Sequence, residues 1–108
     1  MSDEWKTDYD KRQCASMRDA LRLYETGTIN LDSLITGLHA LFNALEMTDD
    51  LWRNEFLRGW GTIEDVYASA MYRVEQSRSE NLESILKEPD NQARISAAIE
   101  SLKHLLKL

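Results

Sequence analysis

The amino-acid sequence predicts an all-α protein, an up-and-down bundle of four main helices with one additional short helix. Apolar residues recur at intervals of three or four along most of the chain, and no segment shows the apolar-polar alternation of a β-strand. The longest periodic segment, residues 51–74, is rich in aromatic residues, so the other helices are expected to pack around it. A chain of 108 residues is the size of one domain, and residues 1–108 are expected to form a single helical domain.

The first helix is predicted over residues 8–25. Its apolar face carries four residues at helical spacing, Cys14, Met17, Leu21 and Tyr24. Gly27 follows the last turn, where a residue in the left-handed conformation commonly ends a helix. Cys14 is the only cysteine and lies on the apolar face, so we interpret it as a buried, inert thiol.

The second helix is predicted over residues 31–45, with Asn30 as its N-cap. Its apolar stripe consists of Leu31, Leu34, Ile35, Leu38, Leu41, Phe42 and Leu45. Gly37 lies beside this stripe, and a glycine inside a helix costs about 1 kcal/mol relative to alanine. We therefore expect a neighbouring helix to cross close to Gly37.

The long helix over residues 51–74 places one apolar face within an arc of about 120°. That face consists of Trp52, Phe56, Gly59, Trp60, Ile63, Val66, Tyr67, Ala70 and Val74. Thr48 is the expected N-cap, Gly59 predicts a close helix contact, and Gly61 on the opposite side indicates a bend. A break at residues 59–61 is the alternative, although the apolar phase continues across them. Because the face is expected to form the core, Trp52→Ala and Trp60→Ala should each destabilise the fold by about 3–5 kcal/mol.

The C-terminal part of the chain predicts a short helix over residues 81–87 and a final helix that begins at Pro89. Proline disfavours helical geometry in the residue before it and suits the first turn of a new helix. The apolar face of the final helix consists of Ile95, Ala98, Ile99, Leu102, Leu105 and Leu106.

The acidic composition favours a basic protein partner. The net charge is −6, and the isoelectric point is near 4.8. Nucleic acid is not an expected partner, because phosphate binding depends on lysine and arginine. Neither a membrane-spanning segment nor a targeting segment is visible in the sequence, so no membrane partner is expected and the protein is interpreted as cytoplasmic.

The sequence contains no pattern typical of an enzyme. His39 and His104 are on different predicted helices and lack the spacing of metal ligands. Glu64 and Asp65 are adjacent, so on a helix their carboxylates point about 100° apart and do not converge on one substrate atom. We therefore predict no catalytic residues, no metal and no cofactor.

A second strip on the long helix has the composition of a protein-binding surface. Its apolar members are Leu57, Ala68, Met71 and Tyr72, and acidic residues lie among them. Either the terminal helices cover this strip, or it is an acidic and aromatic patch for a basic partner. Glu46, Asp49 and Asp50 precede the helix, where they either interact with its N-terminus or contact the same partner. The candidate partner-binding residues are thus Glu46, Asp49, Asp50, Leu57, Glu64, Asp65, Met71 and Tyr72.

Two stretches resemble a group of small helical bacterial proteins. They are residues 24–31, YETGTINL, with Leu34 and Leu38, and residues 63–68, IEDVYA, with Trp52, Phe56 and Trp60. That group is similar to the immunity partners of contact-dependent growth-inhibition toxins. The resemblance implies a protein that binds a basic toxin domain, often a nuclease, in the cytoplasm and occludes its active site. The alternative is a small structural or regulatory protein that acts by self-association, for example as a homodimer that buries Leu57, Met71 and Tyr72.

Overall fold

The fold is that of an all-α bundle, as the sequence predicts. The computed structural model describes residues 7–47 and 49–107, in which there are five helices and no strand. The helices are α1 (Asp8–Glu25), α2 (Leu31–Asn43), α3 (Asp50–Gln76), α4 (Leu82–Leu86) and α5 (Pro89–Leu105). The second helix ends at Asn43, two residues before its predicted end, and the long helix extends to Gln76.

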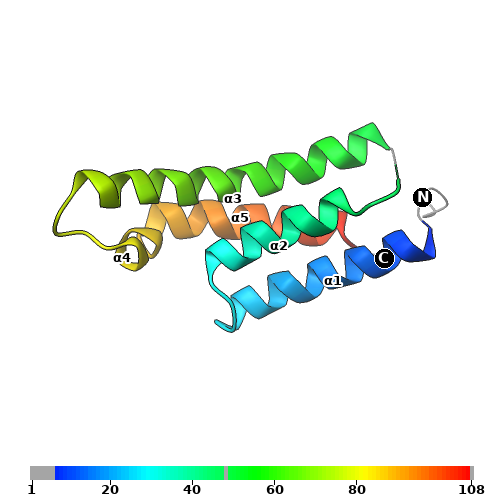
Figure 1. The fold of residues 1–108 in the computed structure, drawn as a ribbon, viewed down its shortest axis with the longest axis horizontal. Helices are drawn as coiled ribbons and strands as arrows, with labels where there is room; N and C mark the ends of the chain where they lie inside the picture. The colour runs from blue at the N-terminus through cyan, green and yellow to red at the C-terminus, as the bar shows by residue number, and fades with distance from the viewer. Residues whose placement is uncertain (1–6, 48, 108) are drawn as a thin grey trace.

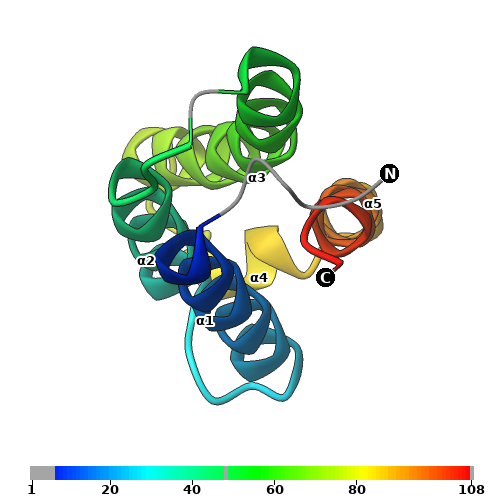
Figure 2. The same cartoon turned by 90° about the vertical axis from the view of Figure 1, so that its right-hand side faces the viewer.

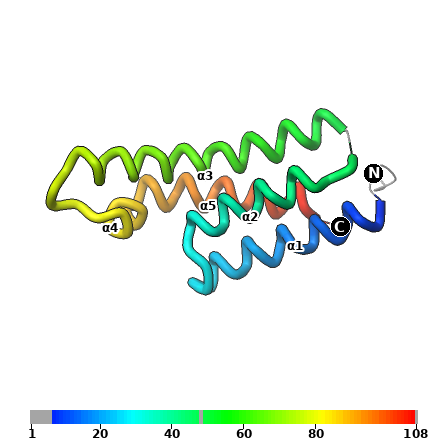
Figure 3. Tube along the Cα trace, in the orientation of Figure 1, coloured from blue at the N-terminus to red at the C-terminus, as the bar shows by residue number. Residues whose placement is uncertain are grey.

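The four long helices run alternately in opposite directions along a body of 51 × 25 × 21 Å (Figure 1). In the view along the long axis of the molecule, α1 and α3 lie on opposite sides of the bundle, and α2 and α5 lie on the two remaining sides (Figure 2). The most extensive contacts are between α3 and α5 and between α1 and α2. The tube in Figure 3 shows that α3 and α5 extend past the turn between α1 and α2, and that α4 lies at this extended end.

The aromatic face of α3 forms much of the core, as expected. Trp52, Phe56 and Ile63 are buried, and the Phe56 ring stacks on Phe42 of α2 with 4.8 Å between ring centroids. Trp60 is only half-buried at the edge of this face. Its indole Nε1 donates a hydrogen bond to the Ile35 carbonyl oxygen at 2.9 Å, so it links α3 to α2.

Local chemistry explains where α1 ends and where α2 and α3 begin. Gly27 has a φ of +79°, which confirms the left-handed residue expected after α1. The Asn30 side chain caps α2 by accepting a hydrogen bond from the Ser33 amide at 2.8 Å. The N-cap of α3 is Asp49, whose carboxylate accepts from the Trp52 amide at 2.8 Å. The expected cap, Thr48, lies outside the described residues.

The glycines inside α2 and α3 have different environments. A Cβ atom on Gly59 would lie 3.0 Å from the Leu102 side chain, which confirms a close contact between α3 and α5. A Cβ atom on Gly37 would meet no atom within 4 Å, so the expected helix crossing there is wrong. Helix α3 is continuous across residues 59–61, and the alternative of a break is therefore also wrong.

Gly37→Ala is expected to raise the free energy of unfolding by about 1 kcal/mol, because alanine stabilises the helix and the added methyl group has free space. Gly59→Ala is the matched control, since its methyl group would press against the buried Leu102 side chain. Urea denaturation followed by circular dichroism measures both. A loss of stability in Gly37→Ala would show that α2 has a close neighbour at this position.

None of the helices among the described residues combines the length and the apolar character needed to cross a lipid bilayer.

Candidate functional site

The outward face of α3 carries a strip of apolar and acidic side chains that are exposed, except for the half-buried Glu64. We call it the α3 strip, and it consists of Leu57, Glu64, Asp65, Ala68, Met71 and Tyr72. These residues fall within an arc of about 120° on the helix, opposite the buried face. Tyr72 is 62% exposed, Leu57 39% and Met71 37%. The expectation that the terminal helices cover this strip is therefore wrong.

The basic residues of α3 contact groups other than the acids of the strip. The Arg53 guanidinium lies 4.4 Å from the centre of the Phe42 ring, and Arg58 forms an ion pair with Glu55 at 3.3 Å. Across the described part of the chain, neither Glu64 nor Asp65 has a cationic side chain within 4 Å. The strip therefore presents negative charge beside exposed apolar surface.

The other predicted site residues lie at the opposite end of α3 from Tyr72. Glu46 and Asp50 are exposed, and Asp49 is the half-buried N-cap. With a rise of 1.5 Å per residue, Asp50 and Tyr72 are about 33 Å apart along the helix. On the same scale Asp50 is only about 10 Å from Leu57, so the acidic end, formed by Glu46, Asp49 and Asp50, adjoins the near end of the α3 strip and is distant only from Tyr72.

Asp10 organises the acidic end, and the predicted site did not include it. Its side chain is fully buried, and its two carboxylate oxygens accept hydrogen bonds from the backbone amides of Glu46 and Met47, both at 2.8 Å. The Thr7 hydroxyl caps the N-terminus of α1 by accepting a hydrogen bond from the Asp10 amide at 3.0 Å. Asp10 thereby fixes the connection between α2 and α3 against α1. The sequence does indicate that Asp10 is buried, because Asp10 precedes Cys14 by four residues and lies on the same face of the helix.

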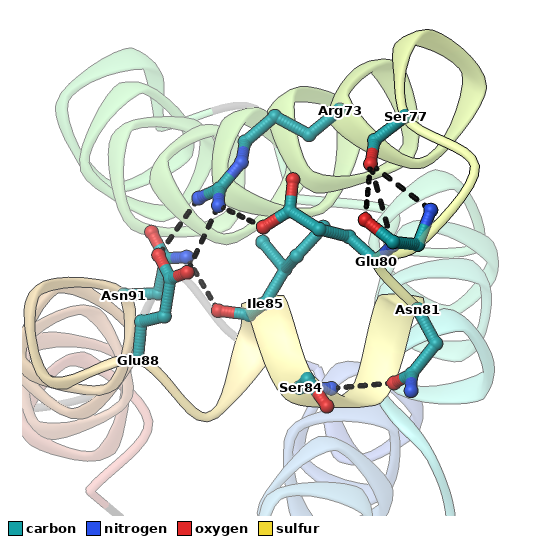
Figure 4. A network of polar contacts seen from close by, with 9 residues as sticks. Arg73, Ser77, Glu80, Asn81, Ser84, Ile85, Glu88 and Asn91 are labelled. Atoms are coloured by element: carbon teal, nitrogen blue, oxygen red, sulfur yellow. Dashed lines mark hydrogen bonds and ion pairs between the residues drawn. The ribbon is translucent and has the colours of Figure 1, made fainter.

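A second polar network closes the opposite end of the bundle (Figure 4). Arg73 of α3 forms a bidentate pair with Glu88, at 2.7 and 3.0 Å, and also donates to Glu80 at 2.6 Å. Asn91 of α5 donates from its side-chain amide to the Ile85 carbonyl oxygen at 2.8 Å. These contacts hold the short helix α4 between the ends of α3 and α5.

The Arg73–Glu88 pair is expected to give the stability of the protein a pH dependence. The hydrogen bonds from Arg73 lower the pKa of Glu88 below its ordinary value of 4.5. Because the folded-state pKa is the lower one, the pair stabilises the fold fully above the unfolded-state pKa and loses its effect as the pH falls through the folded-state pKa. Arg73→Gln should thus lower the urea midpoint near pH 7, and the difference from wild type should narrow as the pH falls below the ordinary pKa of a glutamate.

Arg22→Gln is the control for this prediction, because Arg22 pairs with Asp19 only within one turn of α1. A difference between Arg73→Gln and wild type that stays constant from neutral to acidic pH would contradict the role of Glu88. The side chains of the pair are exposed, so the expected change is modest.

The histidines are not arranged as metal ligands. His39 stacks on Trp60 with 4.9 Å between ring centroids, and His104 is exposed near the end of α5. Over residues 7–47 and 49–107, no group of three or more histidine, cysteine, aspartate or glutamate side chains is placed to hold a metal ion.

Comparison of the chain with protein-family models, with curated proteins and with solved structures finds no match in any of the three.

Proposed function

We propose that this protein is a cytoplasmic immunity protein that binds a basic toxin domain, of the nuclease class, and neutralises it by stoichiometric occlusion of the active site. The observation that carries the proposal is the α3 strip, where exposed Leu57, Met71 and Tyr72 lie beside acids without a cationic neighbour among the described residues. The net charge of −6 and the resemblance to immunity partners of growth-inhibition toxins support the same function.

The chemistry of the strip suits a partner that binds nucleic acid. A nuclease holds the phosphate backbone with lysine and arginine side chains, and these same side chains can pair with Glu64 and Asp65. Long-range attraction would speed the encounter, while desolvation of Tyr72 and its apolar neighbours would slow dissociation. The strip from Leu57 to Tyr72 is about 22 Å long, and a stable interface of about 800 Å² per partner would extend beyond it to adjoining surfaces.

Growth rescue tests the proposal. The protein is expressed together with the product of the reading frame immediately upstream of its gene, and colony formation is compared with and without it. We expect the upstream product to stop growth alone and to permit growth in its presence. An upstream gene without a toxin-like C-terminal domain would contradict the proposal, and so would a toxin that kills equally in both strains.

The second candidate is a structural or regulatory protein that self-associates through the α3 strip. The same exposed apolar residues support it, because a homodimer would bury them against their copies. Size-exclusion chromatography with light scattering distinguishes the two candidates. A monomer of 12.5 kDa is expected if the strip is reserved for another protein. A stable dimer that Tyr72→Lys converts to a monomer would favour self-association.

Asp65→Lys is expected to weaken toxin binding by about tenfold or more, because it reverses a charge within the α3 strip. The unfolding midpoint should stay nearly unchanged, because Asp65 is exposed and has no cationic partner within 4 Å in the described part of the chain. Asp19→Lys on α1 makes the same change of charge far from the strip and is the control. Equal losses in both variants would indicate that net charge alone, and not the α3 strip, determines binding.

A further inference from the structure

An open groove lies where the connection between α1 and α2 faces α4 and α5. Two adjoining cavities of about 840 and 580 Å³ form it, and they share Asn30, Leu31, Glu83 and Leu86 as lining residues. We call their union the α4 groove. The turn between α1 and α2 stops short of the end that carries α4 (Figure 3).

The floor of the α4 groove is apolar. Leu31, Ile95 and Ile99 line it and belong to the buried core. Half-buried Tyr24 and Leu86 complete the floor. Leu31, Ile95 and Ile99 are only 2–3% exposed, so the apolar surface that a bound segment can contact comes mainly from Tyr24 and Leu86.

The rim of the groove is acidic. Four carboxylates line it, those of Glu25, Asp32, Glu83 and Glu100, and the ammonium groups of Lys87 and Lys103 lie against them. Lys103 is 2.7 Å from Glu25 and 3.7 Å from Glu100. Lys87 is 3.5 Å from Glu83, and both side chains are strongly exposed, so this pair exchanges partners at little cost. In the described part of the chain, Asp32 has no cationic side chain within 4 Å. Asp32 and the strongly exposed Glu83 are therefore the rim carboxylates that can pair with a further cation, whereas Glu25 and Glu100 already share Lys103.

The walls of the groove are held in place. On one side, Asn91 and Gln92 of α5 donate side-chain hydrogen bonds to the carbonyl oxygens of Ile85 and Leu86 at 2.8 and 2.7 Å. The Arg73 network in Figure 4 anchors the end of the same wall. On the other side, the Thr28 amide donates to the Leu23 carbonyl oxygen at 2.8 Å and ties the turn to α1. A preformed groove loses less conformational entropy when a ligand binds.

We propose that the α4 groove binds a short segment of a partner protein in which apolar side chains alternate with lysine or arginine. The apolar side chains would occupy the floor over Tyr24 and Leu86, and the cations would pair with Asp32 and Glu83 on the rim. An acidic segment would be repelled by the same rim. This site is separate from the α3 strip, so the proposal does not depend on whether the protein binds a toxin.

Nuclear magnetic resonance with the full-length, ¹⁵N-labelled protein tests the site. The probe is a synthetic peptide of about a dozen residues that alternates leucine with lysine, and the control peptide replaces every lysine by glutamate. We expect the lysine peptide to shift the amide resonances of residues 24–32 and 82–87, and the glutamate peptide to shift none of them. Shifts confined to the α3 strip, equal effects of both peptides, or no binding of the lysine peptide would overturn the proposal.

Charge reversal on the rim tests which carboxylates bind the lysine side chains of the peptide. The double variant Asp32→Lys/Glu83→Lys should bind the lysine peptide about tenfold or more weakly, as measured by fluorescence anisotropy. Asp19→Lys/Glu55→Lys makes the same change of net charge away from the groove and should stay within about twofold of wild type. All four residues are exposed, and circular dichroism verifies that each variant is folded. Equal weakening in the two double variants would show that the groove has no specific role.

Discussion

Trp52→Ala is expected to lower the free energy of unfolding by about 3–5 kcal/mol, the cost of a large truncation in a core. Trp52 is 7% exposed, and its ring stacks on Phe56 with 5.8 Å between centroids. Its Nε1 atom also donates to the Leu105 carbonyl oxygen at 3.3 Å, which joins the start of α3 to the end of α5. Because a small domain is stable by only about 5–15 kcal/mol, this loss is a large part of the total.

Trp60→Ala provides the comparison. Trp60 also lies on the aromatic face, but it is half-buried, and the sequence-based expectation of an equal loss does not allow for this position at the edge of the core. We expect a smaller loss of about 2 kcal/mol, which includes its hydrogen bond to the Ile35 carbonyl oxygen. Urea denaturation followed by far-ultraviolet circular dichroism measures both. A loss below about 1 kcal/mol in Trp52→Ala would place that ring outside the core.

Asp10→Ala is expected to destabilise the protein by about 3 kcal/mol, because it leaves one buried and one partly buried backbone amide without their carboxylate acceptor. Those amides belong to Glu46 and Met47, and both bonds to Asp10 are 2.8 Å long. Asp10→Asn is the matched control, since its amide retains the shape and one acceptor oxygen and should lose less. Chemical denaturation measures the difference.

Amide hydrogen exchange gives a local measure of the same prediction. The Glu46 and Met47 amides should exchange faster in Asp10→Ala than in wild type, because the connection between α2 and α3 is no longer fixed to α1. Unchanged exchange at these two amides, or a stability loss below about 1 kcal/mol, would show that Asp10 is not what holds this connection.

Helical periodicity in the sequence was sufficient to predict the bundle. The steps from Trp52 through Phe56 to Ile63 define a face that only a helix can bury, and Gly27 and Asn30 carry local signals for a helix end and a helix start. Such signals depend on neighbours in the sequence. They can therefore be recognised without any knowledge of the tertiary structure.

Features that depend on distant parts of the chain were not predictable in this way. Asp10 pairs with amides 36 and 37 residues away, so nothing in its local sequence specifies the partners. The exposure of Met71 and Tyr72 depends on where the other helices lie, and periodicity alone left it open. The α4 groove is lined by the connection between α1 and α2 and by residues of α4 and α5, which are far apart in the sequence, so no single segment encodes it.

Isothermal titration of the purified protein with the toxin domain of the upstream gene tests the role of the α3 strip most directly. We predict a one-to-one complex, and a loss of affinity of roughly 100-fold or more in the double variant Asp65→Lys/Tyr72→Ala, because it removes both the charge and the aromatic anchor of the strip. Asp19→Lys should bind like wild type. Full affinity in the double variant, with its fold intact, would contradict the assignment of the α3 strip as the toxin-binding surface.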